Sequence, residues 1–295
     1  PSTGVQIEDA AESWFLHDAD GNRLIYCDYD GVYAANMGDP GYQARWLENV
    51  RSRVAADGFD GVMMDDTNIF PGHCLGSKGT AIAEYPTDEA YGDAVVQFMA
   101  AVGPSLIADG LLVAPNIAMN PWDETMLAQT EAMLPYITHW VREYWMRWED
   151  GEHFRNSTWA STLDTMRIAQ EAGVAYLAIT KGPGDEGAEA GQFYGRASWL
   201  LVWDGASDSA WGYFGSEGGD PWSPTWGPDI GLPLEEAVET DGVWLRRYGG
   251  GIVLVNPTDD DGVVVSLGET YVDPDLGDVD EVTLDRGMAR VLARP

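Results

Sequence analysis

The chain has 295 residues, of which 45% are hydrophobic and 22% charged, and this length suits one large domain or a large domain with a small one. Its 16 Lys and Arg against 49 Asp and Glu give a formal net charge of −33. Such a charge opposes binding to nucleic acid or to anionic lipid surfaces. No apolar run reaches the roughly 18 residues that a membrane span needs, so membrane insertion is not expected either.

Two interpretations can explain the excess of acidic residues. A disordered acidic chain is disfavoured by 13 Trp and 13 Tyr. A folded protein in high salt is favoured, because a Debye length of roughly 3 Å at 1 M removes the self-repulsion. The only lysines are Lys78 and Lys181, and this scarcity resembles proteins of salt-loving archaea or their viruses. We therefore expect a high-salt environment. The sequon 156–158 weakly indicates export, to the cell surface or beyond.

Cys27 and Cys74 are the only cysteines, too few for a disulfide framework, and no Cys/His spacing typical of a metal site occurs. They either pair with each other or are two buried thiols, and the second alternative is favoured. No metal and no cofactor are expected.

Helix-like and strand-like segments alternate between residues 41 and 231. This order predicts a parallel sheet, and the continuous apolar runs are typical of strands buried on both faces. The spacing predicts helices over 41–57, 88–108, 122–134, 158–172 and 189–203, and strands over 61–64, 111–114, 137–144, 174–180 and 210–214.

A (β/α)8 TIM-type barrel over residues 1–234 fits better than a doubly wound sheet. No Gly-rich phosphate turn follows an early strand, and polar residues end strand after strand. If strand 210–214 is the eighth, strand 61–64 is the fourth, and 24–37 is a candidate for the third. About two expected strands then lie upstream of Pro1, in 1–23, or in a partner chain.

In residues 235–295 apolar and polar residues alternate with a period of two, and turns separate the short stretches. They predict a small C-terminal antiparallel β-sandwich domain, with strands over 243–248, 251–256, 262–268, 279–284 and 287–294.

The strongest site signal is Asp65-Asp66 at the end of strand 61–64, followed by Asn68. A carboxylate at the end of a buried strand is costly unless it is hydrogen-bonded or used, which makes it a candidate. The alternative is that one Asp caps the following turn. We expect one of the two aspartates to have a catalytic role and the other to have a structural role.

Several motifs resemble the hypothetical glycosyl hydrolases of the α-amylase-like (β/α)8 superfamily. They are WFLHDADG at 14–21, DPGY at 39–42, GFDGVMMDD at 58–66 and VNP at 255–257. The resemblance implies that Asp65 is the nucleophile, at the end of the fourth strand. The superfamily usually has Arg two residues before it, where this chain has Met63.

Glu143 is the second candidate carboxyl group, because strand 137–144 ends two strands after Asp65 and a glycosidase needs two carboxyl groups. This order of nucleophile and acid looks like that of the α-galactosidase clan. The alternative is that Glu143 pairs with Arg142 or Arg147 on the rim. The fallback acids are Glu149, Asp150 and Asp185.

The remaining candidates would bind substrate. Asn side chains can hydrogen-bond sugar hydroxyls, although they can equally cap loops. Aromatic rings suit the apolar faces of pyranoses, although they can equally pack in the core. The Lys181 cation can pair with an anionic sugar, although it can equally be an ordinary loop residue. His73 and His139 are expected to be structural or solvated, and an Asp65–Asp66–His73 metal site is a weak pattern. The predicted substrate-binding residues are Asp66, Asn68, Asn116, Tyr144, Trp145, Lys181, Trp222 and Trp226.

Together these features predict a glycoside hydrolase of poly- or oligosaccharides, with Asp65 and Glu143 as the catalytic pair and a carbohydrate as partner. The alternatives are a barrel that binds glycan without cleaving it and, more distantly, a metal-dependent phosphoesterase. The sequence leaves the oligomeric state and the sugar open.

Overall fold

The computed structural model describes residues 6–27, 29–72, 74–75, 81–148, 151–182, 188–215 and 229–295. The chain divides into two compact units, Pro1–Trp140 and Val141–Pro295. Over the described ranges, no helix has the length and apolar character needed to cross a membrane.

The first unit begins with an irregular antiparallel segment. Two short 3-10 helices, η1 (Ile7–Asp9) and η2 (Glu12–Trp14), precede isolated bridges that join Phe15 to Ala35, His17 to Arg23 and Ile25 to Tyr33. The prediction of a parallel barrel strand over 24–37 is therefore wrong. This segment folds back on itself in short turns instead of running alongside β1.

Helix α1 (Pro40–Asp57) begins and ends as its sequence predicts. Asp39 accepts hydrogen bonds from the backbone N–H groups of Gly41 and Tyr42, and proline occupies the first turn. Gly58, with a φ of 71°, ends the helix in the left-handed region that glycine favours.

A disulfide joins Cys27 to Cys74, 47 residues apart. The favoured interpretation of two buried thiols was therefore wrong. The bond ties the N-terminal segment to the chain that follows the first parallel strand, and the two cysteines reach each other through tertiary folding that their spacing does not reveal.

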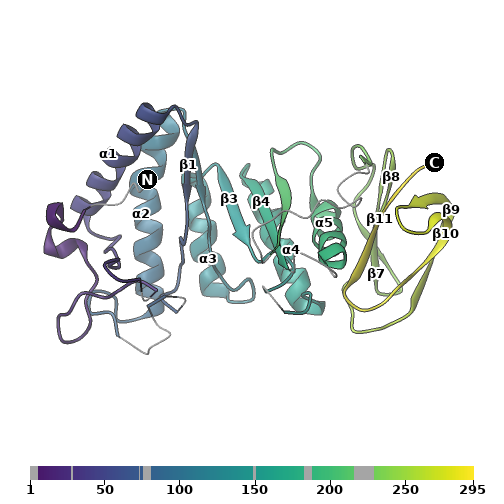
Figure 1. Cartoon of the computed structure of the whole chain (residues 1–295), viewed down its shortest axis with the longest axis horizontal. Helices are drawn as coiled ribbons and strands as arrows, with labels where there is room; N and C mark the ends of the chain where they lie inside the picture. The colour runs from purple at the N-terminus through teal and green to yellow at the C-terminus, as the bar shows by residue number, and fades with distance from the viewer. Residues whose placement is uncertain are drawn as a thin grey trace. The chain divides into compact units, whose positions relative to one another are not determined.

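The first unit contains one parallel pair of strands within the described residues. β1 (Gly61–Met64) pairs with β2 (Leu112–Pro115) in register from Gly61↔Leu112 to Met64↔Pro115. At Gly61 a Cβ atom would collide with the Leu112 backbone, so the strands approach this closely only with glycine there. The accompanying helices are α2 (Asp88–Ala108), α3 (Glu124–Met133) and the short η3 (Leu134–Tyr136) (Figure 1).

β3 (His139–Glu143) crosses the division between the units and belongs to a second parallel sheet. The order of this sheet is β3–β4–β5, with α4 (Asn156–Glu171) and α5 (Ala188–Val202) between its strands in the chain. β4 (Ala175–Gly182) pairs in parallel with β5 (Ala210–Gly215). All five predicted α/β strands are present. In the residues described they form sheets of two and three strands, so the structure establishes a mixed α/β fold and not the complete eight-stranded barrel.

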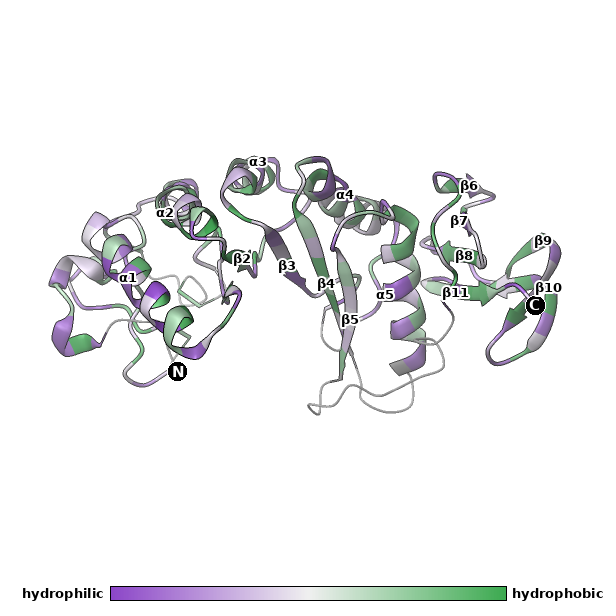
Figure 2. Ribbon diagram, turned by 90° about the horizontal axis from the view of Figure 1, so that it is seen from above, coloured by the Kyte–Doolittle hydropathy of each residue, from purple (hydrophilic) through white to green (hydrophobic). Residues whose placement is uncertain are grey.

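A curled antiparallel sheet of six strands forms the C-terminal part of the second unit, in the order β10–β9–β11–β8–β7–β6. It is one sheet instead of the predicted sandwich of two. Figure 2 shows β8 and β11 as mainly hydrophobic, and every residue of β8 is buried. The strands are β6 (Val238–Thr240), β7 (Val243–Tyr248), β8 (Gly251–Asn256), β9 (Val263–Asp273), β10 (Gly277–Leu284) and β11 (Met288–Ala293).

Arg246 on β7 joins this sheet to the end of α5. Its Nη1 donates to the backbone oxygens of Leu200 (3.0 Å) and Trp203 (2.6 Å), and its Nε donates to that of Glu235 (2.7 Å). The last carbonyls of a helix have no partner within the helix, so this buried guanidinium satisfies them. The domain boundary predicted near residue 234 stays a prediction.

Candidate functional site

Asp65 follows β1 directly and is held by two hydrogen bonds to one oxygen. Its Oδ1 accepts from Asn116 Nδ2 (2.9 Å) and from the backbone N–H of Asp66 (2.9 Å). The Asp65 side chain is exposed, whereas Asn116 is only 7% exposed. The second oxygen, Oδ2, has no hydrogen-bond partner among the described residues. The carboxylate is thus oriented through one oxygen and offers the other to solvent.

Backbone hydrogen bonds place Asn116 beside Asp65. The Asn116 N–H donates to the Met64 carbonyl (2.8 Å), and the Thr67 N–H donates to the Asn116 carbonyl (2.9 Å). These bonds continue the β1–β2 pairing beyond both strands, as expected for parallel strands whose carboxyl ends meet at one edge. The structure therefore brings two predicted site residues, Asp65 and Asn116, together.

Asp66, unlike Asp65, takes part in the hydrogen bonds of the turn that follows β1. Its φ is 50°, and its carbonyl accepts from the Asn68 N–H (2.7 Å) in the turn after β1. Its carboxylate interacts with the Tyr26 hydroxyl, which also accepts from Asn68 Nδ2 (3.3 Å). Burial, and then the Asp66 carboxylate, raise the pKa of Tyr26.

Tyr26 is a site residue that the sequence reasoning missed. It lies about 40 residues before Asp66 in an irregular segment, so no periodicity points to it. The only sequence signal was its position next to Cys27, because the disulfide to Cys74 anchors this segment near the loop that follows β1.

Glu143 at the end of β3 lies in a second cluster, in the second unit. Lys181 Nζ is 3.5 Å from Glu143 Oε1 and 4.6 Å from the centre of the Tyr144 ring. The Glu143 side chain is 34% exposed and that of Lys181 19%. Trp148, which is 46% exposed, packs against Tyr144 with ring centres 5.3 Å apart. The rim partner of Glu143 in the structure is thus Lys181, which was itself a predicted site residue.

Trp145 does not join this cluster. It is completely buried, and its Nε1 donates to the Gly195 carbonyl (2.9 Å). Strand alternation would place it on the same face as Glu143, but Tyr144 and Met146 have φ values of 58° and 66° and end the alternation. This burial contradicts a direct sugar contact for Trp145 and favours core packing.

Other candidates have no described placement. Trp222, Trp226, His73 and the fallback acids Glu149, Asp150 and Asp185 lie outside the described residues. In the part of the chain that the structure describes, no group of three His, Cys, Asp or Glu side chains is arranged to hold a metal ion.

The two clusters differ in the chemical groups that they present. The Asp65 cluster contains an oriented carboxylate with amide and phenol groups beside it. The Glu143 cluster offers a second carboxyl group, an ammonium group and an exposed tryptophan ring. Each cluster is formed by residues of a single unit.

Comparison with solved structures finds glycoside hydrolases. A family 39 glycoside hydrolase from Bacteroides cellulosilyticus WH2 matches with a TM-score of 0.52 at 8% identity, over 95% of this chain and 66% of its own. A maltogenic α-amylase from Thermotoga neapolitana (TM-score 0.48, 10% identity) matches over 96% of this chain and 72% of its own. A family 31 dextranase from Flavobacterium johnsoniae with bound glucose (TM-score 0.45, 13% identity) matches over 98% of this chain, which spans only 41% of the dextranase.

A search of curated proteins finds no match. The sequence profile of the hypothetical glycosyl hydrolase family 15, in contrast, matches residues 1–252, which include both carboxylate clusters. The chain therefore belongs to the hypothetical glycosyl hydrolase family 15.

Proposed function

We propose that the protein is a glycoside hydrolase that cleaves a poly- or oligosaccharide with two carboxyl groups, Asp65 as nucleophile or base and Glu143 as general acid. The observation that carries this proposal is the geometry of Asp65. Both of its hydrogen bonds go to Oδ1, so Oδ2 is the atom available to attack an anomeric carbon or to activate a water.

The position of Asp65 in the fold supports the same role. Catalytic groups of (β/α)8 enzymes lie at the carboxyl ends of the parallel strands, where Asp65 follows β1 and Glu143 ends β3. We propose that the five strands belong to such a barrel. Consistent with this, the sheet β1–β2 gives β1 a partner on one edge only, within the described residues.

Substrate hydroxyls would be bound by the side chains around the two acids. Asn116, Asp66 and Asn68 lie beside Asp65, and Asn68 Oδ1 is buried without a hydrogen-bond donor among the described residues. Tyr144 and Lys181 lie beside Glu143. The cleavage mode follows from the separation of the two carboxyl groups in the complex with substrate, about 5–5.5 Å for retention and about 6.5–9.5 Å for inversion.

Asp65→Asn and Glu143→Gln test the proposal on a panel of neutral and acidic oligosaccharides. We expect turnover to fall by about 10²–10⁴-fold or more in each variant while sugar affinity is retained. Asp60→Asn is the matched control, because Asp60 is exposed at the opposite end of β1. NMR of the first-formed anomer then distinguishes retention from inversion.

A carbohydrate-binding protein without hydrolytic activity is the second candidate. It is favoured by Met63, which is 58% exposed where the superfamily usually has Arg. In that case the wild type binds glycans without releasing products, and Asp65→Asn scarcely changes affinity.

We also propose that the protein works outside the cytoplasm in high salt. The disulfide Cys27–Cys74 supports an oxidising compartment, and the net charge of −33 supports high salt. Thiol labelling of the protein in fractionated source cells tests this, since a reduced pair in a cytoplasmic fraction contradicts it.

A further inference from the structure

A cavity of about 280 Å³ in the second unit is lined by several basic side chains and by one acidic side chain, Glu152. Three of the chain's 14 arginines, Arg147, Arg155 and Arg286, line it together with His153. It lies among the segment that follows β3, the start of α5 and the turn before β11. The chain has about three acidic residues for each basic one, so a cavity with four basic side chains is unexpected.

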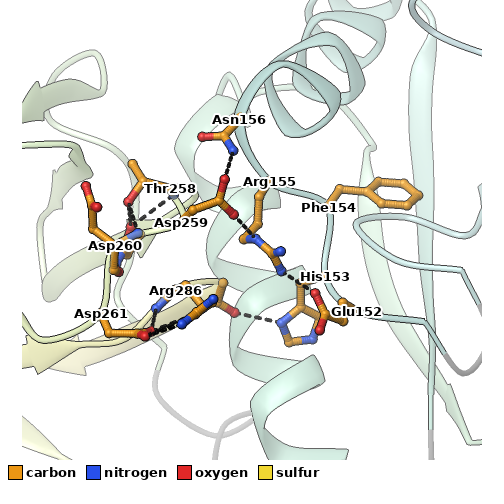
Figure 3. A network of polar contacts seen from close by, with 12 residues as sticks. Glu152, His153, Phe154, Arg155, Asn156, Thr258, Asp259, Asp260, Asp261 and Arg286 are labelled. Atoms are coloured by element: carbon orange, nitrogen blue, oxygen red, sulfur yellow. Dashed lines mark hydrogen bonds and ion pairs between the residues drawn. The ribbon is translucent and has the colours of Figure 1, made fainter.

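Two of the three arginines already have carboxylate partners, as Figure 3 shows. Arg155 Nε donates to Asp259 Oδ1 (2.7 Å) and its Nη1 to Glu152 Oε2 (2.8 Å). Arg286 Nε donates to Asp261 Oδ1 (2.9 Å). These carboxylates neutralise both arginines, and the Arg155–Asp259 pair joins the segment before α4 to the C-terminal sheet.

Arg147 has no such partner among the residues that the structure describes. It is only 8% exposed, its Nε is completely buried, and no described residue forms a hydrogen bond or ion pair with its guanidinium. Gly182 and Gly191 make room for it, since a Cβ atom at these positions would lie 3.0 and 3.4 Å from Nη1. A buried charge without a partner is strongly destabilising, so this site favours an anion.

His153 provides a hydrogen-bond acceptor in the same cavity as the Arg147 donors. Its Nδ1 is 2.7 Å from the Gly287 carbonyl, which can only accept, so Nδ1 carries the proton. The ring stacks on Tyr194 with centres 4.5 Å apart. Burial, with Arg147 and Arg155 nearby, lowers the pKa of His153 to about 4. Nε2 is therefore an acceptor, and it is buried without a donor among the described residues.

We infer that this cavity binds a small hydroxy-carboxylate, of the size of one acidic sugar, whose carboxylate accepts from Arg147 and whose hydroxyl donates to His153 Nε2. A neutral sugar leaves Arg147 unpaired. A bare oxyanion such as sulfate has no proton to offer Nε2. The cavity, at about 280 Å³, is slightly smaller than the roughly 300–1,000 Å³ typical of ligand sites, which limits the ligand to about one ring.

This inference goes beyond the proposed hydrolysis and does not depend on it, because neither Asp65 nor Glu143 lines the cavity. Glu143→Gln should therefore keep the binding described here. If that variant loses turnover but keeps this binding, both proposals stand, and each can fail without the other.

The test is calorimetric titration of the full chain with D-glucuronate, D-glucose and sulfate at one fixed salt concentration. We expect glucuronate to bind the wild type at least 10-fold more tightly than either other ligand. If glucose or sulfate binds the wild type as tightly as glucuronate or more tightly, the inference is wrong. This outcome needs no variant.

Arg147→Met should weaken glucuronate binding at least 10-fold, because it removes the charge and keeps an unbranched side chain. Arg167→Met is the control, since Arg167 is an exposed arginine that pairs with Asp164 on α4. Unchanged glucuronate affinity in a folded Arg147→Met variant contradicts the inference. His153→Phe keeps a ring against Tyr194 without the acceptor, and should also weaken glucuronate binding.

Discussion

The two units hold their arginines in different ways. In the first unit Arg23, Arg45, Arg51 and Arg53 all pair with carboxylates, and their side chains are 28–44% exposed. In the second unit several are buried, including Arg246, which binds backbone carbonyls. Exposed ion pairs contribute little and weaken with salt, whereas removing the Arg246 guanidinium leaves buried carbonyl acceptors unpaired. We therefore expect the disulfide to contribute more to the stability of the first unit than its ion pairs do, and buried polar contacts to be important in the second.

The largest effect is expected from removing the disulfide. The double substitution Cys27→Ser and Cys74→Ser should lower the free energy of unfolding by about 4 kcal/mol, because the bond closes a loop of 47 residues in the unfolded chain. Denaturant unfolding at fixed salt measures this. A loss below about 1 kcal/mol would show that the first unit is held mainly by its packing.

The second effect tests the buried arginine. Arg246→Met should cost about 3 kcal/mol, because the carbonyls of Glu235, Leu200 and Trp203 lose their donor. Arg247→Met is the matched control. Arg247 is the next residue on β7, is 44% exposed and pairs with Glu235 Oε1 (3.1 Å), so less than about 1 kcal/mol is expected. Equal losses in both variants would contradict the comparison.

The third effect depends on pH. The folded pKa of His153, about 4, lies below the roughly 6.5 of an unfolded histidine, so the unfolded state binds the proton first as pH falls. Between pH 7.5 and 5, wild type should lose about 2 kcal/mol more stability than His153→Asn, which keeps a donor for the Gly287 carbonyl. Urea midpoints across this range measure the difference.

His17 in the first unit provides the opposite sign. Hydrogen bonds to Glu12 and Glu84 raise its pKa, so its contribution is full below about pH 6.5 and is lost as pH rises through the raised value. His17→Asn should therefore cost more stability at pH 5 than at pH 8. The same pH trend for both histidine variants would be inconsistent with their environments.

The smallest effect belongs to the surface pairs. Arg45→Met removes the Arg45–Glu48 pair on α1 and should change stability by about 0.5 kcal/mol or less, with the difference vanishing at 1 M salt. Thermal unfolding at low and high salt measures this. A loss above about 1.5 kcal/mol that persists at 1 M salt would show that exposed pairs matter in the first unit.

The alternation of helices and parallel strands could be predicted from the sequence, because each segment carries its own period and stop signal. Gly58 after α1 and Gly173 after α4 both have positive φ and end the helix before a parallel strand. The segment 24–37 could not be assigned in this way. Its structure depends on isolated bridges and on a disulfide partner 47 residues away.

The site could be predicted only in part, for a similar reason. Asp65 and Asn116 end adjacent strands, so sequence order alone brings them together. Lys181 was expected near the strand ends but not as the partner of Glu143. Trp145 was misplaced because a left-handed residue, Tyr144, cannot be recognised from its side chain.

The partners of Arg246 have one more consequence. Its acceptors are peptide oxygens without formal charge, held in a buried contact between α5 and β7. Dissolved ions do not reach this contact to compete for either group. The attachment of the C-terminal sheet to the α/β part of its unit should therefore be as firm in concentrated brine as in fresh water.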